Sequence, residues 1–177
     1  MVNLAFLVIV TLFLIICQTV ILPTFSWFPQ CFDLLITNIL FLSLTHSHYG
    51  AIIGIMLIGG IMDSISGVPF FHHIFSYLWI YLIVQLFKQF VFQRSVLFVI
   101  LISVISVVIQ QGMVLFSVFL DQGRGAVFQM DFSLMLKQVF WGGVFIPPGV
   151  WMINVLRQNY FYGLRYMNRA FDRRYRG

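Results

Sequence analysis

The first 87 residues of the chain carry only two formally charged side chains, Asp33 and Asp63. The whole chain is 61% hydrophobic and 8% charged, whereas soluble domains average about 25% charged residues. So little charge leaves no polar surface to present to water, which predicts an all-α integral membrane protein. The 177 residues have room for about six helical spans and no separate soluble domain.

Prolines, glycines and short polar runs divide the chain into apolar segments. The first segment lacks a basic start and a small-residue cleavage site, so it is expected to remain as a span. The polar run HSHYG at 46–50 separates the second segment from the third, with one long tilted helix as the alternative. The predicted fold is a bundle of about six transmembrane helices over 1–156 and a basic tail over 157–177. The predicted spans are 2–22, 32–45, 49–66, 73–87, 95–120 and 134–156.

Lysine and arginine mark the cytoplasmic side of a membrane protein, because they are retained there during insertion. Eight of the ten bases fall on one predicted face: Lys88, Arg94, Arg157, Arg165, Arg169, Arg173, Arg174 and Arg176. Arg124 and Lys137 fall on the other face, with four of the five acids. With an even number of spans, both termini are then cytoplasmic.

The tail has apolar and basic residues on different faces of a predicted helix. Such a helix is expected to lie on an anionic lipid surface, which would be contacted by Arg165, Arg169, Arg173, Arg174 and Arg176. The net charge of +5 therefore indicates a membrane surface as the partner and not nucleic acid.

Polar side chains recur at helical spacing inside two predicted spans. These are Ser103, Ser106, Gln110 and Ser117 in the fifth span and Thr11 and Gln18 in the first. Because an amide in hydrocarbon needs a hydrogen-bond partner, both stripes are expected to face other helices. The alternative is that they line a small-molecule cavity.

The third span carries small residues, among them Gly50, Gly54 and Gly59, which let another helix approach closely. This span is therefore expected to be central in the bundle. Gly67 and then Pro69 predict the end of the helix, which places Asp63 about one turn before that end.

A carboxylate costs about 2.5–3.5 kcal/mol at the centre of a bilayer, and a helix C-terminus disfavours negative charge. These two penalties predict that Asp63 has a partner. The candidates are His72, His73, Arg124 and Lys137. The alternative is an acid that reaches the membrane surface at a loop.

The run from Gly60 to His73 contains the pattern GxxDxxSGxPxxxH, formed by Gly60, Asp63, Ser66, Gly67, Pro69 and His73. This pattern resembles the signature of the bacterial rod shape-determining MreD family, and the short length, the span pattern and the basic tail are also like that family. The family usually has glycine two residues after the proline. This chain has Phe71 there, so the resemblance does not extend to close backbone packing at that turn.

The resemblance implies a non-enzymatic inner-membrane subunit of the cell-elongation machinery. Such proteins bind the single-span protein MreC and help to link the MreB filament to the peptidoglycan synthases. Gly59, Gly60, Asp63, Ser66, Gly67, Pro69 and His73 would then form a partner-binding or structural signature. No cofactor is implied.

Catalytic and metal-binding patterns are not found in the sequence. Asp33 is the nearest second acid to Asp63, but its predicted loop setting makes an aspartyl pair a weak hypothesis. Cys17 and Cys31 lack disulfide or zinc spacing, and the His46/His48 and His72/His73 pairs have no ligand cluster beside them. No metal site is therefore predicted.

Pro147 and Pro148 lie inside the last predicted span. Because proline removes a backbone donor, the helix is expected to kink or break there. Broken helices line substrate sites in transporters, so the alternative function is the substrate-binding subunit of a vitamin-type transporter. An intramembrane enzyme is a more distant third hypothesis.

Overall fold

A computed structural model describes residues 4–25, 32–67, 71–90, 96–123 and 131–175, without the side chains of residues 90, 122 and 164–175. Within these ranges the chain forms α-helices, one π-helical turn and one 3-10 turn, and no strand. The α-helices are α1 (Leu4–Ile16), α2 (Leu35–Thr45), α3 (His48–Ser66), α4 (His72–Phe90), α5 (Val96–Gln122) and α7 (Phe132–Tyr175). The prediction of an all-α fold is confirmed.

Four segments of the described chain are long and apolar enough to cross a membrane: Ala5–Thr24, His48–Ser66, Val96–Asp121 and Phe132–Gly163. These include α3, most of α5 and the first part of α7. The second predicted span instead contains α2, an apolar helix of 11 residues. At 1.5 Å per residue α2 is about 16 Å long, roughly half the thickness of a hydrocarbon core.

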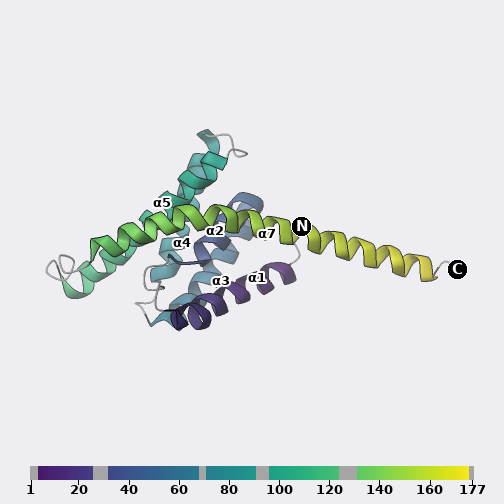
Figure 1. Cartoon of the computed structure of the whole chain (residues 1–177), viewed down its shortest axis with the longest axis horizontal. Helices are drawn as coiled ribbons and strands as arrows, with labels where there is room; N and C mark the ends of the chain where they lie inside the picture. The colour runs from purple at the N-terminus through teal and green to yellow at the C-terminus, as the bar shows by residue number, and fades with distance from the viewer. Residues whose placement is uncertain (1–3, 26–31, 68–70, 91–95, 124–130, 176–177) are drawn as a thin grey trace.

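The short helix α2 lies at the centre of the bundle and contacts α1, α3, α4, α5 and α7 (Figure 1). Its residues from Leu35 to Ser43 are all buried, and they include the polar residues Thr37, Asn38 and Ser43. The expectation that the third span is central was wrong. Among the described helices, α3 packs mainly against two, α4 and α2. Its small residues admit one close neighbour, and many of its other side chains remain exposed.

The last helix, α7, is continuous over 44 residues and includes Pro147 and Pro148. Of the predicted kink or break at the prolines, the break was therefore wrong, and the kink stays a prediction. Tight packing holds the helix on both sides of them: a Cβ added to Gly142 would lie 2.5 Å from Val107, and one added to Gly149 would lie 2.8 Å from Thr37. The predicted boundary at 156/157 falls within α7, whose C-terminal part projects beyond the other helices (Figure 1). The side chains of Arg165, Arg169, Arg173, Arg174 and Arg176 lie outside the described set, so their lipid contact stays a prediction.

Candidate functional site

The two acids of the N-terminal half lie in one buried polar cluster, which we call the two-aspartate cluster. Its members are Asp33, Asp63, His73, Tyr77 and Gln110. They come from the start of α2, the end of α3, the start of α4 and the middle of α5. The cluster therefore connects four helices.

Asp33 accepts hydrogen bonds from three groups. Its Oδ1 accepts from the backbone N–H of Leu35 at 2.9 Å, in the first turn of α2. Its Oδ2 accepts from the Tyr77 hydroxyl at 2.5 Å and from Nε2 of Gln110 at 2.9 Å. The positive end of the α2 dipole also favours a carboxylate at this position.

Asp63 joins the end of α3 to the start of α4. Its Oδ1 accepts from the backbone N–H of His73 at 2.7 Å and lies 2.9 Å from Nδ1 of the same residue. The predicted partner is thus present and is His73, while the neighbouring His72 places Nδ1 2.8 Å from Oγ of Ser117. Although the C-terminus of α3 disfavours the charge of Asp63, the N-terminus of α4 offsets this penalty.

Tyr77 lies between the two acids. Its side chain is fully buried, its hydroxyl donates to Asp33, and its ring lies 5.8 Å from the His73 ring, centroid to centroid. The hypothesis that the polar stripe of the fifth span faces other helices is confirmed for Gln110 and Ser117. Ser103 and Ser106 are buried as well, although their hydroxyls donate to backbone carbonyls of α5 itself.

The stripe of the first predicted span is also partly confirmed. Thr11 Oγ1 accepts from Nδ2 of Asn38 on α2 at 2.7 Å, whereas Oε1 of Gln18 is buried without a hydrogen-bond partner. In the two-aspartate cluster, Oδ2 of Asp63 and Oε1 of Gln110 are also buried without a hydrogen-bond partner. The cluster therefore retains spare acceptors. The described residues contain no group of three side chains suited to hold a metal ion.

The other end of α2 is capped by a base. Lys88 Nζ donates to the backbone oxygen of Ser43 at 2.9 Å, and Gln85 Nε2 donates to the same oxygen at 3.2 Å. A cation near a helix C-terminus complements the dipole, just as Asp33 does at the N-terminus. Helix α4 thus supplies partners for both ends of the short central helix.

The turn between α3 and α4 has the conformation that the glycines predict. Gly67 ends α3 with φ 66°, in the left-handed region, which confirms the predicted C-cap. A Cβ on Gly59 would lie 2.8 Å from Cα of Ile74, so α3 and α4 meet here backbone to backbone. The Ser66 hydroxyl donates to the carbonyl of Met62 at 2.7 Å, within α3. Pro69 lies outside the described residues.

Phe71 also adopts a left-handed conformation, with φ 74°, at the position where the MreD pattern usually has glycine. This conformation costs an L-residue about 1–2 kcal/mol, whereas it costs glycine almost nothing. The Phe71 and Phe75 ring centroids lie 6.2 Å apart, and this ring contact offsets part of that cost. Glycine would therefore adopt the backbone conformation of Phe71 with less strain than phenylalanine does.

We expect Phe71→Gly to be more stable than Phe71→Ala by about 1 kcal/mol. Both variants lose the ring contact with Phe75, but alanine keeps the Cβ that strains the left-handed conformation. Thermal unfolding of the protein in detergent measures the difference. Equal melting temperatures would show that φ at this position is not positive in the membrane protein.

Sequence reasoning missed two members of the two-aspartate cluster, Asp33 and Tyr77. It treated Asp33 as a loop acid, although an Asp just before an apolar helix is itself a start signal. Tyr77 carried no signal, because a tyrosine in an apolar helix is common. Lys88 was assigned to a loop, but it belongs to α4 and its amine reaches the end of α2.

The fold and the cluster define an all-α protein of the membrane class, in which the buried polar groups join helices to one another. No family model, curated protein or solved structure matches this chain.

Proposed function

We propose that this chain is a non-enzymatic inner-membrane subunit of the bacterial cell-shape, or elongation, complex. In this role it binds a single-span protein of the MreC type and thereby helps to organise an MreB-type filament and the peptidoglycan synthases. The proposal includes both termini in the cytoplasm, because eight of ten bases then share one face.

The observation that carries the proposal is the pairing of Asp63 with His73 across the α3–α4 turn. These are the acid and the histidine of the pattern that resembles MreD. The side chain of Asp63 is fully buried and holds the first turn of α4. The spacing between Asp63 and His73 is thus explained by their hydrogen bond within the fold, and no catalytic role is needed to explain it.

The transporter alternative has lost one of its supports, although both prolines do line a groove between α2, α5 and α7. It depended on a helix broken at Pro147 and Pro148, but α7 continues through both. The two acids of the cluster also point toward tyrosine, histidine and backbone donors of neighbouring helices. These contacts favour an assembly subunit whose surface is shaped by its buried network.

Asp63→Asn is expected to fold but to bind its partner more weakly. Asparagine retains one carbonyl oxygen for the two His73 donors and removes the charge. Loss of the charge-assisted bond to His73 costs about 1.5–3 kcal/mol of stability at the turn, so the complex is expected to weaken by at most roughly 10- to 150-fold. The measurement is the amount of MreC-type protein captured by the tagged chain from membranes, normalised to the amount of bait.

Asp121→Asn is the matched control, because Asp121 is an exposed acid at the end of α5 and the charge change is the same. Unchanged capture by Asp63→Asn would exclude the turn from partner recognition. If wild-type protein captured no such partner, and its depletion left rod shape intact, the proposed function itself would be wrong.

A further inference from the structure

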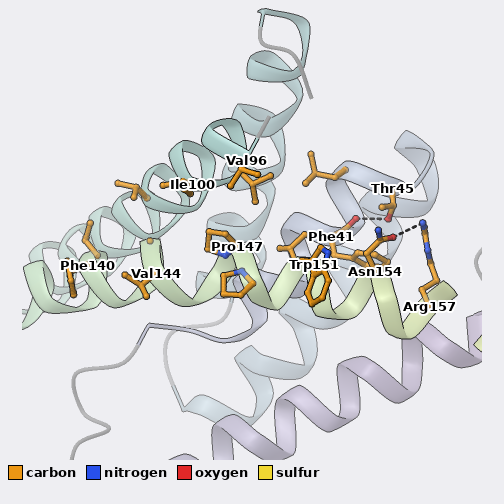
Figure 2. Close-up of a pocket in the computed structure, with 17 residues that line it drawn as sticks. Phe41, Thr45, Val96, Ile100, Phe140, Val144, Pro147, Trp151, Asn154 and Arg157 are labelled. Carbon is orange, nitrogen blue, oxygen red and sulfur yellow. Dashed lines mark hydrogen bonds between the residues drawn. The ribbon is translucent and has the colours of Figure 1, made fainter. Parts of the chain in front are cut away.

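A second feature of the molecule lies away from the two-aspartate cluster, in a groove of about 1370 Å³ between α2, α5 and α7. Apolar side chains and both prolines of α7 form most of its lining, as Figure 2 shows. Polar side chains gather at one end, where Thr45, Asn154 and Arg157 lie. The groove is therefore amphipathic along its length.

Arg157 is the cation at the polar end. Its Nη2 donates to Oδ1 of Asn154 at 2.9 Å, and its guanidinium carbon lies 5.4 Å from the centre of the Phe41 ring. Neither contact neutralises the charge, and no carboxylate of the described residues lies within ion-pair distance of it. The guanidinium has five N–H donors, and Asn154 retains its amide donors because its oxygen faces Arg157. This end can therefore bind an anion.

The positive charge of Arg157 also acts on a neighbouring histidine outside the helices. Burial, and then the charge of Arg157, lower the pKa of His46 below its ordinary value. His46 is therefore neutral at pH 7 and leaves Arg157 as the charge at this end.

On α7 the lining of the groove runs from Val139 to Arg157, about 27 Å, and its half that begins at Arg157 matches one leaflet of a bilayer. Arg157 and Pro147 are ten residues apart on α7, or about 15 Å, which is half of a hydrocarbon core of about 30 Å. Trp151 lies between them and is exposed (Figure 2). An occupant thus needs an anion at one end and about 15 Å of apolar chain.

We propose that this groove binds one phospholipid with an anionic headgroup, its phosphate on Arg157 and Asn154 and an acyl chain along α7 past Pro147 to Val144. The charge pattern favours a lipid over a partner helix, because the described lining has one cation at headgroup depth and no acid. Every phospholipid molecule carries a phosphate, which is the complementary anion, at that depth. This inference does not depend on the proposed cell-shape function.

The test is the binding of phosphatidylglycerol to the full-length protein in detergent, followed by native mass spectrometry over a lipid titration. We expect Arg157→Gln to weaken binding at least about tenfold, or about 1.4 kcal/mol. Lys137→Gln removes the same charge from an exposed position near the other end of the α7 span and should bind as the wild type does. Val144→Trp, which places a large side chain in the groove, should reduce lipid binding without a change in charge.

Equal binding by wild type and Arg157→Gln would overturn the proposal, because the lipid would then be held without this site. Equal loss in Arg157→Gln and Lys137→Gln would also overturn it, as a general charge effect. The proposal would also be overturned if a second copy of the chain, or a copurified protein helix, crosslinked to residue 144 and excluded lipid. The Arg157→Gln and Lys137→Gln pair decides the result even if Val144→Trp fails to fold.

Discussion

Asp33→Ala is expected to destabilise the protein by about 3 kcal/mol and to lower its amount in the membrane. The substitution removes the acceptor of three buried donors, on Leu35, Tyr77 and Gln110. Each unsatisfied donor costs about 1–3 kcal/mol, and values in membranes lie toward the lower end because the unfolded helices find other partners. Thermal unfolding in detergent and the membrane-fraction level measure the effect.

Asp131→Ala is the matched control for this prediction. Asp131 makes the same local bond, from its Oδ1 to the backbone N–H two residues later, at 2.9 Å. It is exposed at the start of α7 and makes no described side-chain bond to another helix. Its loss should cost about 1 kcal/mol or less, as for an ordinary helix cap. Similar losses for both variants would mean that Asp33 acts as a cap alone.

Asp33→Asn separates the charge of Asp33 from its hydrogen bonds. An asparagine can keep its oxygen toward Leu35 and direct its amide toward Tyr77 and Gln110. Gln110 can rotate its amide so that Oε1, which has no partner in the structure, accepts a hydrogen bond from the asparagine. We therefore expect Asp33→Asn to retain most of the stability that Asp33→Ala loses.

The sequence allowed prediction of the site where the contacts are local. Asp63 and His73 are ten residues apart on either side of a turn, and the left-handed Gly67 marks that turn. Their pairing follows from a helix end, a glycine and a buried charge that needs a partner. The all-α fold likewise follows from composition.

The remaining contacts of the cluster depend on how distant helices pack. Asp33 is 44 residues from Tyr77 and 77 residues from Gln110, and no local periodicity connects them. The central place of α2 also depends on packing, because its apolar sequence would equally suit a helix exposed to lipid. Propensity failed at Pro147 and Pro148, where tight contacts of Gly142 and Gly149 maintain the helix.

Gly59→Ala and Gly60→Ala are expected to have opposite effects, although the two residues are neighbours in α3. Both gain the helix propensity of alanine, up to about 1 kcal/mol. A Cβ on Gly60 would meet only the end of the Ile74 side chain at 3.9 Å, so this variant should be as stable as the wild type or more so. A Cβ on Gly59 would lie 2.8 Å from the Ile74 backbone, which cannot move without displacing α4.

The loss in Gly59→Ala should reach about 2–3 kcal/mol, the upper part of the usual range for overpacking, because the obstacle is backbone. Displacing α4 also pulls His73 away from Asp63, since His73 directly precedes Ile74. Capture of the proposed MreC-type partner should therefore fall in Gly59→Ala but not in Gly60→Ala. Melting temperatures of the two variants in detergent provide the stability measurement, and equal values would show that α3 and α4 do not meet at Gly59. If Gly59→Ala melted lower yet captured its partner normally, the close contact would stabilise the bundle without shaping the binding surface.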